Sequence, residues 1–161
     1  MIRKMRKNKD GIHIYDMDAH EGIKKACEIA SKTLDMIGNY VETGVTTEKL
    51  DEMCHDFILS HNSVPATLGY RGYPKSCCIS LNHVVCHGIP SNKKLKNGDI
   101  LNIDVTCILD GWYGDTSRMF TVGNIGLKSK RLIEITHDAL LLAIKNVTPG
   151  KTLSLIHISE P

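Results

Sequence analysis

The first third of the chain holds two stretches in which apolar residues recur every three or four positions. The first predicts a helix that begins near Asp18, with Glu21 placed three residues on as in a capping box, and that stops by Gly44. The second predicts a helix capped by Thr46. Both apolar stripes are typical of core packing. They comprise Ile23, Ala26, Cys27, Ala30, Leu34 and Ile37, then Leu50, Met53, Cys54, Phe57 and Ile58.

The pattern changes after these helices, where glycine and proline interrupt the chain around Tyr70 and Tyr73. This composition predicts a loop that presents aromatic side chains. Residues 77–81 and 83–86 are expected to form two short strands, separated by a turn at Asn82.

Asp110-Gly111 lies between two apolar, β-branched runs, which is a strong signal for a hairpin with a two-residue turn. In that register Asp104 faces Ser117, and Asp115 faces Thr106. Because side chains alternate along a strand, both carboxylates then point to the same side of the hairpin as diagonal neighbours.

Two like charges on one partly buried face repel each other, so a neutralising partner is expected. Carboxylates that bridge two cations are typical of two-metal hydrolytic sites, which makes Asp104 and Asp115 candidate metal ligands. The alternatives stay open at this point. The two aspartates could be solvated or could bond to turn backbone, and a slip of one residue or a bulge would separate them onto opposite faces.

Ser129 is expected to cap a third long helix, which Pro149-Gly150 ends. The order of two helices, strands, a hairpin and a helix predicts an α+β fold with an antiparallel sheet and helices packed on one face. The length of 161 residues suits one domain with a real core.

The overall charge argues against nucleic acid as a partner. The formal net charge of +2 implies no strong electrostatic field that would attract nucleic acid, although basic residues cluster within residues 1–15. A flexible, solvated segment is the expected state of that cluster, and contact with RNA is the alternative.

No apolar stretch is long enough to cross a bilayer, and no secretory signal is visible. The six cysteines form no Cys-x-x-Cys pair, which argues against a zinc ribbon or a thioredoxin-type motif. The lack of both a secretory signal and a disulfide framework favours reduced thiols in the cytoplasm.

His87 stands before a Gly-Ile-Pro turn, where it could hold a substrate or transfer a proton. A histidine bonded to loop backbone is the alternative, and it is favoured when the residue is taken alone. His83 precedes it by four residues, the spacing of a helical zinc pair, but valines and a proline argue against a helix there. His83 is therefore expected to be structural or to lie at the rim of the site.

Tyr70 and Tyr73, with Thr67 and Leu68, could line an apolar pocket with wet polar tips, or could simply pack as a loop. Cys78 has no obvious activating neighbour, so it is expected to act as a small hydrophobic residue rather than a nucleophile.

Four stretches together resemble the type I methionine aminopeptidases, in that family's order and with similar spacing. They are Leu68-Gly69-Tyr70-Arg71-Gly72-Tyr73-Pro74-Lys75-Ser76, Val84-Val85-Cys86-His87-Gly88-Ile89-Pro90, Gly98-Asp99-Ile100-Leu101-Asn102-Ile103-Asp104-Val105 and Gly111-Trp112-Tyr113-Gly114-Asp115-Thr116-Ser117. The Gly-Tyr-x-Gly-Tyr-Pro loop separates the chain from prolidase-like and creatinase-like relatives.

The resemblance implies the first half of a pita-bread fold and metal-dependent removal of the initiator methionine from nascent chains whose second residue is small. It implies two divalent ions, such as Co, Mn, Fe or Zn, and action in the cytoplasm, with the ribosome as a further partner and no role for membrane or DNA. Asp104 and Asp115 match two metal ligands, and His87 matches the histidine that contacts substrate near the scissile amide. Tyr70, Tyr73, Cys78 and Thr67 match the walls of the methionine side-chain pocket.

The resemblance covers residues 16–152, and the tail at 153–161 departs from it, so we expect a foreign junction there. It also implies three further metal ligands, one His and two Glu, that have no counterpart in this sequence. We therefore expect an incomplete site with little or no turnover by this polypeptide alone. The alternative from another functional class is a non-catalytic pita-bread module that binds protein or RNA.

Overall fold

The computed structural model describes residues 6–152 and residue 154, in two units that divide between Gly123 and Asn124. In the first unit the chain forms β1 (Arg6–Lys7), β2 (His13–Ile14), α1 (Met17–Gly38), α2 (Thr47–Ser60), β3 (Val64–Pro65), a short 3-10 turn (Tyr70–Gly72), β4 (Cys78–Leu81), β5 (Ile100–Leu109) and β6 (Trp112–Thr121). The second unit contains α3 (Leu127–Asn146).

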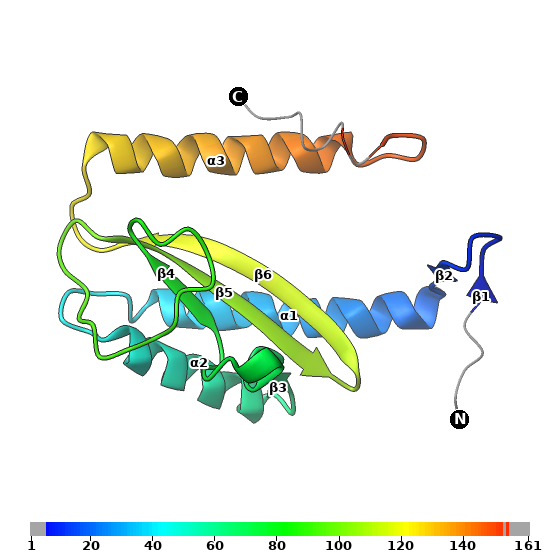
Figure 1. The fold of residues 1–161 in the computed structure, drawn as a ribbon, viewed down its shortest axis with the longest axis horizontal. Coiled ribbons are helices and arrows are strands. Elements are labelled where there is room, and N and C mark those ends of the chain that lie inside the picture. The colour runs from blue at the N-terminus through cyan, green and yellow to red at the C-terminus, as the bar shows by residue number, and fades with distance from the viewer. Residues whose placement is uncertain (1–5, 153, 155–161) are drawn as a thin grey trace. The chain divides into compact units, whose positions relative to one another are not determined.

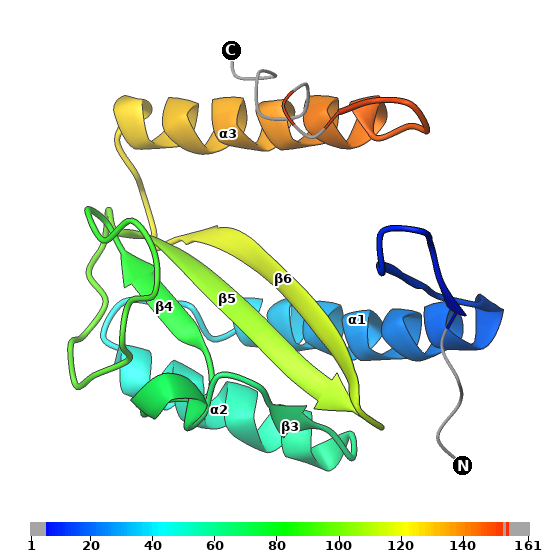
Figure 2. The same cartoon turned by 45° about the vertical axis from the view of Figure 1, so that its right-hand side comes forward.

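β5 is the centre of an antiparallel sheet in the first unit. β6 pairs along its whole length on one edge, while β4 and β3 pair with its two halves on the other. Helices α1 and α2 both lie on one face of this sheet, as Figures 1 and 2 show. The predicted α+β class, the antiparallel sheet and the packing of helices on one face are thus confirmed for this unit.

The caps of the helices only partly follow the predictions. Thr46 caps α2 as predicted, because its Oγ1 accepts a hydrogen bond of 3.1 Å from the backbone N–H of Lys49. The cap of α1 was wrong by two residues, since the carboxylate of Asp16 accepts from the N–H of Ala19 at 2.9 Å. The cap of α3 was also wrong. That helix begins after Gly126 without a side-chain cap, so Ser129 lies inside its first turn.

The hairpin prediction is confirmed residue for residue. Leu109 pairs with Trp112, so Asp110 and Gly111 form the two-residue turn. Their φ angles of 51° and 83° are the left-handed values that such a turn needs and that glycine adopts without strain.

The predicted strand at residues 83–86 was wrong, whereas the preceding strand exists as β4. Asn82 and His87 both adopt left-handed φ angles, 54° and 53°, which are incompatible with continuous extended chain. The side chain of Asn82 is instead bonded to the start of β5, accepting from the N–H of Ile100 at 3.1 Å. Residues 83–86 therefore form an exposed loop.

The core lies between the two helices and the facing side of the sheet. Along β5, Leu101, Ile103, Val105 and Cys107 are fully buried in it, while the alternate residues Asn102, Asp104, Thr106 and Ile108 are only partly buried. The core is formed by Ile29, Ala30, Leu34, Ile37, Leu50, Cys54, Ile58, Cys77, Ile79, Leu81, Leu95, Leu101, Ile103, Val105, Cys107 and Val122. Helices α1 and α2 thus cover one face of the sheet, and the polar residues of β5 lie on the opposite face.

The structure describes only part of the basic N-terminal segment and of the C-terminal tail. Residues 6–14 form the β1–β2 hairpin, and the rest of the basic segment, residues 1–5, lies outside the described residues. The tail at 153–161 also lies outside them, except for Ser154. In the part of the chain that is described, no helix combines the length and apolar character that a bilayer crossing requires.

Candidate functional site

The two candidate metal ligands lie on the face of the sheet opposite to α1 and α2. β5 places Asp104 opposite Ser117 of β6, and Asp115 stands opposite Thr106, in the predicted register. Both carboxylates therefore point to one side as diagonal neighbours. The hydroxyl of Thr106 donates a hydrogen bond of 3.0 Å to Oδ1 of Asp115, which fixes that side chain.

Asp104 and Asp115 are close enough to affect each other's charge. Burial of Asp104 raises the pKa of its carboxyl above the ordinary value, and the charge of Asp115 with a hydrogen bond between the side chains raises it further. The nearby His87 lowers the same pKa. The arrangement therefore disfavours two negative charges in the absence of a cation, and a cation at this position would relieve that repulsion.

His87 lies in the exposed loop after β4, near enough to Asp104 to affect its pKa. Its positive φ of 53° is uncommon for a residue with a side chain, and such strain is often found at functional sites. The following Gly88 is fixed to β4, because its N–H donates to Oγ of Ser80 at 3.1 Å and its carbonyl accepts from the N–H of Ile79 at 2.8 Å. A Cβ at Gly88 would overlap the Ile79 carbonyl, so only glycine permits this approach.

Tyr73 and Cys78 join the same neighbourhood. β4 pairs Cys78 directly with Asp104, so their side chains share a face of the sheet. The Tyr73 hydroxyl donates to the carbonyls of Cys77 at 3.1 Å and Gly88 at 2.9 Å. Burial raises the pKa of both the Tyr73 hydroxyl and the Cys78 thiol, so both groups stay protonated at neutral pH. This agrees with the expectation that Cys78 is not a nucleophile.

The other two residues that the resemblance assigns to the pocket, Thr67 and Tyr70, lie on the preceding loop. Thr67 is half-buried and donates a hydrogen bond of 2.6 Å to the Ser76 carbonyl, which ties the beginning of the loop to its end. Tyr70 is 63% exposed, with the Arg71 guanidinium 5.5 Å from its ring centre. The loop therefore presents Tyr70, as predicted, while Tyr73 turns inward. The backbone N–H of Tyr73 donates a hydrogen bond of 2.9 Å to the Tyr70 carbonyl, which joins the two aromatic residues of the loop. His83, the other histidine considered, is exposed on the loop before His87.

The donor set is consistent with metal binding but is small. Two carboxylate oxygen donors suit hard or borderline divalent ions. Among the described residues, no group of three or more His, Cys, Asp and Glu side chains gathers closely enough to hold a metal ion. Asp104 and Asp115 alone would therefore supply only part of the coordination shell of a metal ion.

A cleft of about 330 Å³ lies away from this face, between the start of α1 and the hairpin turn. Its lining residues are Asp18, Glu21, Gly22, Lys25, Leu109, Asp110 and Trp112. Lys25 is among these acidic side chains and opposes their charge. We therefore place the candidate site at Asp104 and Asp115, whose carboxylates share one face of the sheet and lie near enough to His87 for it to lower the pKa of Asp104.

Sequence reasoning missed a second group of polar residues, on α2. Asp51 is buried and contacts the loop that ends at Cys78, while Thr47 contacts the loop that follows His87. One signal was present in the sequence. Asp51 lies three residues before Cys54 and seven before Ile58, so it falls on the apolar stripe, where a carboxylate requires partners.

Comparisons with known proteins agree with this geometry. The profile of metallopeptidase family M24 matches residues 21–159. The methionine aminopeptidase of Rickettsia prowazekii (strain Madrid E) is 58% identical over 131 residues, which are 81% of this chain and 51% of that protein. The methionine aminopeptidase of Escherichia coli (strain K12) is 52% identical over 135 residues, which are 83% of this chain and 51% of that protein.

Solved structures give the same result. The crystal structure of methionine aminopeptidase from Rickettsia prowazekii matches with a TM-score of 0.90 and 53% identity, over 92% of this chain and 60% of that one. The prolidase from Pyrococcus furiosus matches with a TM-score of 0.78 at 23% identity, over 91% of this chain and 42% of that one, which supports the fold alone. The chain spans about half the length of the curated relatives it matches. Because the family profile matches most of its length, this chain belongs to metallopeptidase family M24, and its fold is the part of the pita-bread fold that it shares with the methionine aminopeptidases.

Proposed function

We propose that this chain contributes to the metal-dependent removal of N-terminal methionine from proteins, and that it supplies two metal ligands and the side-chain pocket. One observation carries this proposal. The sheet register sets Cys78 beside Asp104, so the candidate pocket directly adjoins the candidate metal ligands. An exopeptidase needs this adjacency, because the side chain that it recognises belongs to the residue whose peptide bond it cleaves.

Asp104 and Asp115 are the residues that would hold the metal ions. A bound divalent ion lowers the pKa of a coordinated water molecule and polarises a carbonyl group, which is the chemistry that peptide hydrolysis needs at neutral pH. The raised pKa of Asp104 supports this role, because it reflects a negative face that favours a cation. Thr106 holds the Asp115 carboxylate in a fixed orientation, which reduces the cost of ordering that ligand.

The substrate would lie between this face and the loops. The half-buried Tyr73 ring and the neutral Cys78 thiol offer an apolar, polarisable wall that suits a methionine thioether. Tyr70 and Thr67 would complete this wall when substrate is bound. His87 is exposed and lies near enough to Asp104 to lower the pKa of that carboxyl, and in this proposal it hydrogen-bonds to the scissile amide and assists proton transfer there.

The proposed function also specifies the substrates of the enzyme and the compartment in which it acts. The substrates would be nascent polypeptide N-termini with a small second residue, acted on in the cytoplasm, where these chains are made and meet the ribosome. The identity of the metal ions is proposed only as a class, divalent Co, Mn, Fe or Zn.

The 161-residue polypeptide alone is expected to release little or no methionine from a Met-Ala-Ser peptide in the presence of added Co²⁺ or Mn²⁺. The resemblance implies five metal ligands, and this chain supplies two of them. Free methionine can be quantified by chromatography. Release at a rate near that of the Rickettsia prowazekii enzyme would contradict the assignment of this chain as a partial site.

A chimera tests the function itself. In the Rickettsia prowazekii methionine aminopeptidase, the segment that matches this chain is replaced by residues 21–152 of this chain. We expect methionine release from Met-Ala-Ser within about tenfold of the parent enzyme, which corresponds to about 1.4 kcal/mol in the activation barrier. The same chimera with Asp104→Asn is the matched inactive control. A folded chimera that binds metal but releases no methionine would instead favour the non-catalytic binding module.

A further inference from the structure

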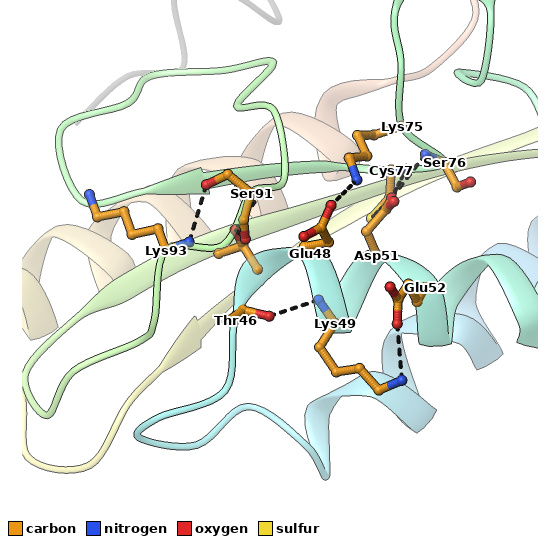
Figure 3. Close-up of polar contacts among 11 residues, drawn as sticks. Thr46, Glu48, Lys49, Asp51, Glu52, Lys75, Ser76, Cys77, Ser91 and Lys93 are labelled. Carbon is orange, nitrogen blue, oxygen red and sulfur yellow. Dashed lines mark hydrogen bonds and ion pairs between the residues drawn. The ribbon is translucent and has the colours of Figure 1, made fainter.

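Helix α2 holds the segment that precedes Cys78 through one buried carboxylate. Asp51 is 5% exposed, and its Oδ1 accepts hydrogen bonds from the backbone N–H groups of Ser76 and Cys77, both at 2.9 Å. The Cys77 thiol donates to the same oxygen at 3.4 Å. Figure 3 shows the Asp51 side chain directed from α2 toward these two residues. A buried charge is costly without such partners, so these contacts fix the segment strongly.

The same turn of α2 also holds the loop that follows His87. The hydroxyl of Thr47 donates to the Ser91 carbonyl at 3.1 Å, and it accepts from the Ser91 N–H at 2.9 Å. Beside it, Glu48 forms an ion pair of 2.7 Å with Lys75 (Figure 3). One face of one helix thus contacts both of the loops that border the candidate site.

A continuous series of hydrogen bonds and covalent neighbours connects Asp51 to the candidate pocket. Asp51 fixes Cys77, whose carbonyl accepts from the Tyr73 hydroxyl. That hydroxyl also donates to the carbonyl of Gly88, the neighbour of His87. Cys78 follows Cys77 directly and begins β4 beside Asp104. Movement of the segment at Ser76 and Cys77 would therefore shift both walls of the pocket, Tyr73 and Cys78.

We propose that Asp51 is a positioning residue for recognition of the methionine side chain, acting through Ser76 and Cys77 on Tyr73 and Cys78. This inference rests on the proposed function, since it assigns those two residues to the methionine pocket. Asp51 itself does not touch the substrate. Its role is to accept the two backbone hydrogen bonds that set where the pocket walls stand.

Three substitutions separate this role from simple packing. In Asp51→Asn the amide oxygen replaces Oδ1 and can still accept both N–H groups, so the geometry is expected to survive. Asp51→Leu keeps similar bulk without an acceptor, and Asp51→Ala removes both. Asp56→Ala is the matched control, because Asp56 is an exposed carboxylate on the same helix.

The first measurement is amide hydrogen exchange by NMR on the ¹⁵N-labelled 161-residue chain. In Asp51→Ala and Asp51→Leu, the Ser76 and Cys77 amides should exchange roughly 10- to 100-fold faster, as expected for loss of a hydrogen bond to a charged acceptor. Asp51→Asn and Asp56→Ala should retain slow exchange. Amides in β5 and α1 report whether each variant is still folded.

The second measurement is an NMR titration of the Zn²⁺-loaded chain with Met-Ala-Ser and with Ala-Ala-Ser. The ratio of the two dissociation constants measures recognition of the methionine side chain. We expect this ratio to fall toward one in Asp51→Ala and Asp51→Leu, and to be retained in Asp51→Asn. Zn²⁺ affinity should not change in any variant, because Asp51 contacts neither Asp104 nor Asp115.

The outcomes are distinct. Preference for Met-Ala-Ser that persists in the Ala and Leu variants, together with unchanged exchange at Ser76 and Cys77, would overturn the positioning role and leave the proposed function intact. Absence of any preference in the unsubstituted chain would instead contradict the proposed pocket, and with it the recognition role of Asp51. Loss in Asp51→Asn equal to that in Asp51→Ala would show that charge, rather than the two hydrogen bonds, is what matters, and would also overturn the proposal.

Discussion

Replacement of Asp104 or Asp115 by asparagine is expected to weaken Mn²⁺ binding by the chain at least about tenfold. Loss of even an outer partner of a metal ligand costs roughly 10- to 100-fold in affinity, so loss of a ligand carboxylate should cost no less. The two side chains share one face of the hairpin, and burial together with their mutual repulsion raises the pKa of Asp104. Each substitution removes one of the negative charges that attract the ion.

Isothermal titration calorimetry measures this change, and the hairpin itself supplies a matched control. Asp110→Asn removes a carboxylate from the same hairpin but keeps its turn, because asparagine also adopts the left-handed φ of 51° found there. Mn²⁺ affinity should be unchanged in this variant. Equal losses in Asp110→Asn and Asp104→Asn would mean that general negative charge, and not a defined pair, attracts the ion.

A methyl group at Gly114 is expected to destabilise the first unit by about 1–3 kcal/mol, the usual cost of overpacking a close contact. Gly114 is buried on β6, one residue before Asp115, and a Cβ there would overlap the backbone of Ala26 and Cys27 in α1. The overlap is with backbone rather than with a flexible side chain, so helix and strand must separate. Such a separation would also displace Asp115.

Urea unfolding followed by circular dichroism tests Gly114→Ala. With typical urea dependences of 1–3 kcal/mol per molar for small proteins, the midpoint should fall by roughly 1 M. Gly126→Ala is the control, because a Cβ at Gly126 meets nothing within 4 Å and its φ of −69° suits any residue. A midpoint for Gly114→Ala equal to that of the unsubstituted chain would mean that α1 and β6 do not approach so closely.

The paired aspartates could be predicted from sequence because their placement is a local property. Asp110-Gly111 selects a two-residue turn, and the turn then sets every cross-strand pair from Leu109–Trp112 outward. The Asp104 and Asp115 positions follow from counting along two regular strands. The apolar periodicity of α1 and α2 is local in the same way, and both helices lie where it predicted them.

Other features depend on contacts that no local pattern contains. Residues 83–86 have the composition of a strand, but the side chain of Asn82 bonds to the start of β5 and turns the chain away. The cap of α1 was misplaced because Asp16 and Asp18 are both good capping residues, and only the fold decides between them. Asp51 contacts residues 25 and 26 positions further along, so its partners could not be read from its surroundings in sequence.

We propose that Asp104 and Asp115 form one metal-binding site beside Cys78 and His87. The most direct test is a Mn²⁺ titration of the ¹⁵N-labelled chain, because this paramagnetic ion broadens the NMR signals of amides near it. We expect selective broadening of the amides of Asp104, Asp115, Cys78 and His87, and its loss in Asp104→Asn. Broadening centred instead on the acidic cleft at Asp18, Glu21 and Asp110, or broadening that persists in Asp104→Asn, would contradict it.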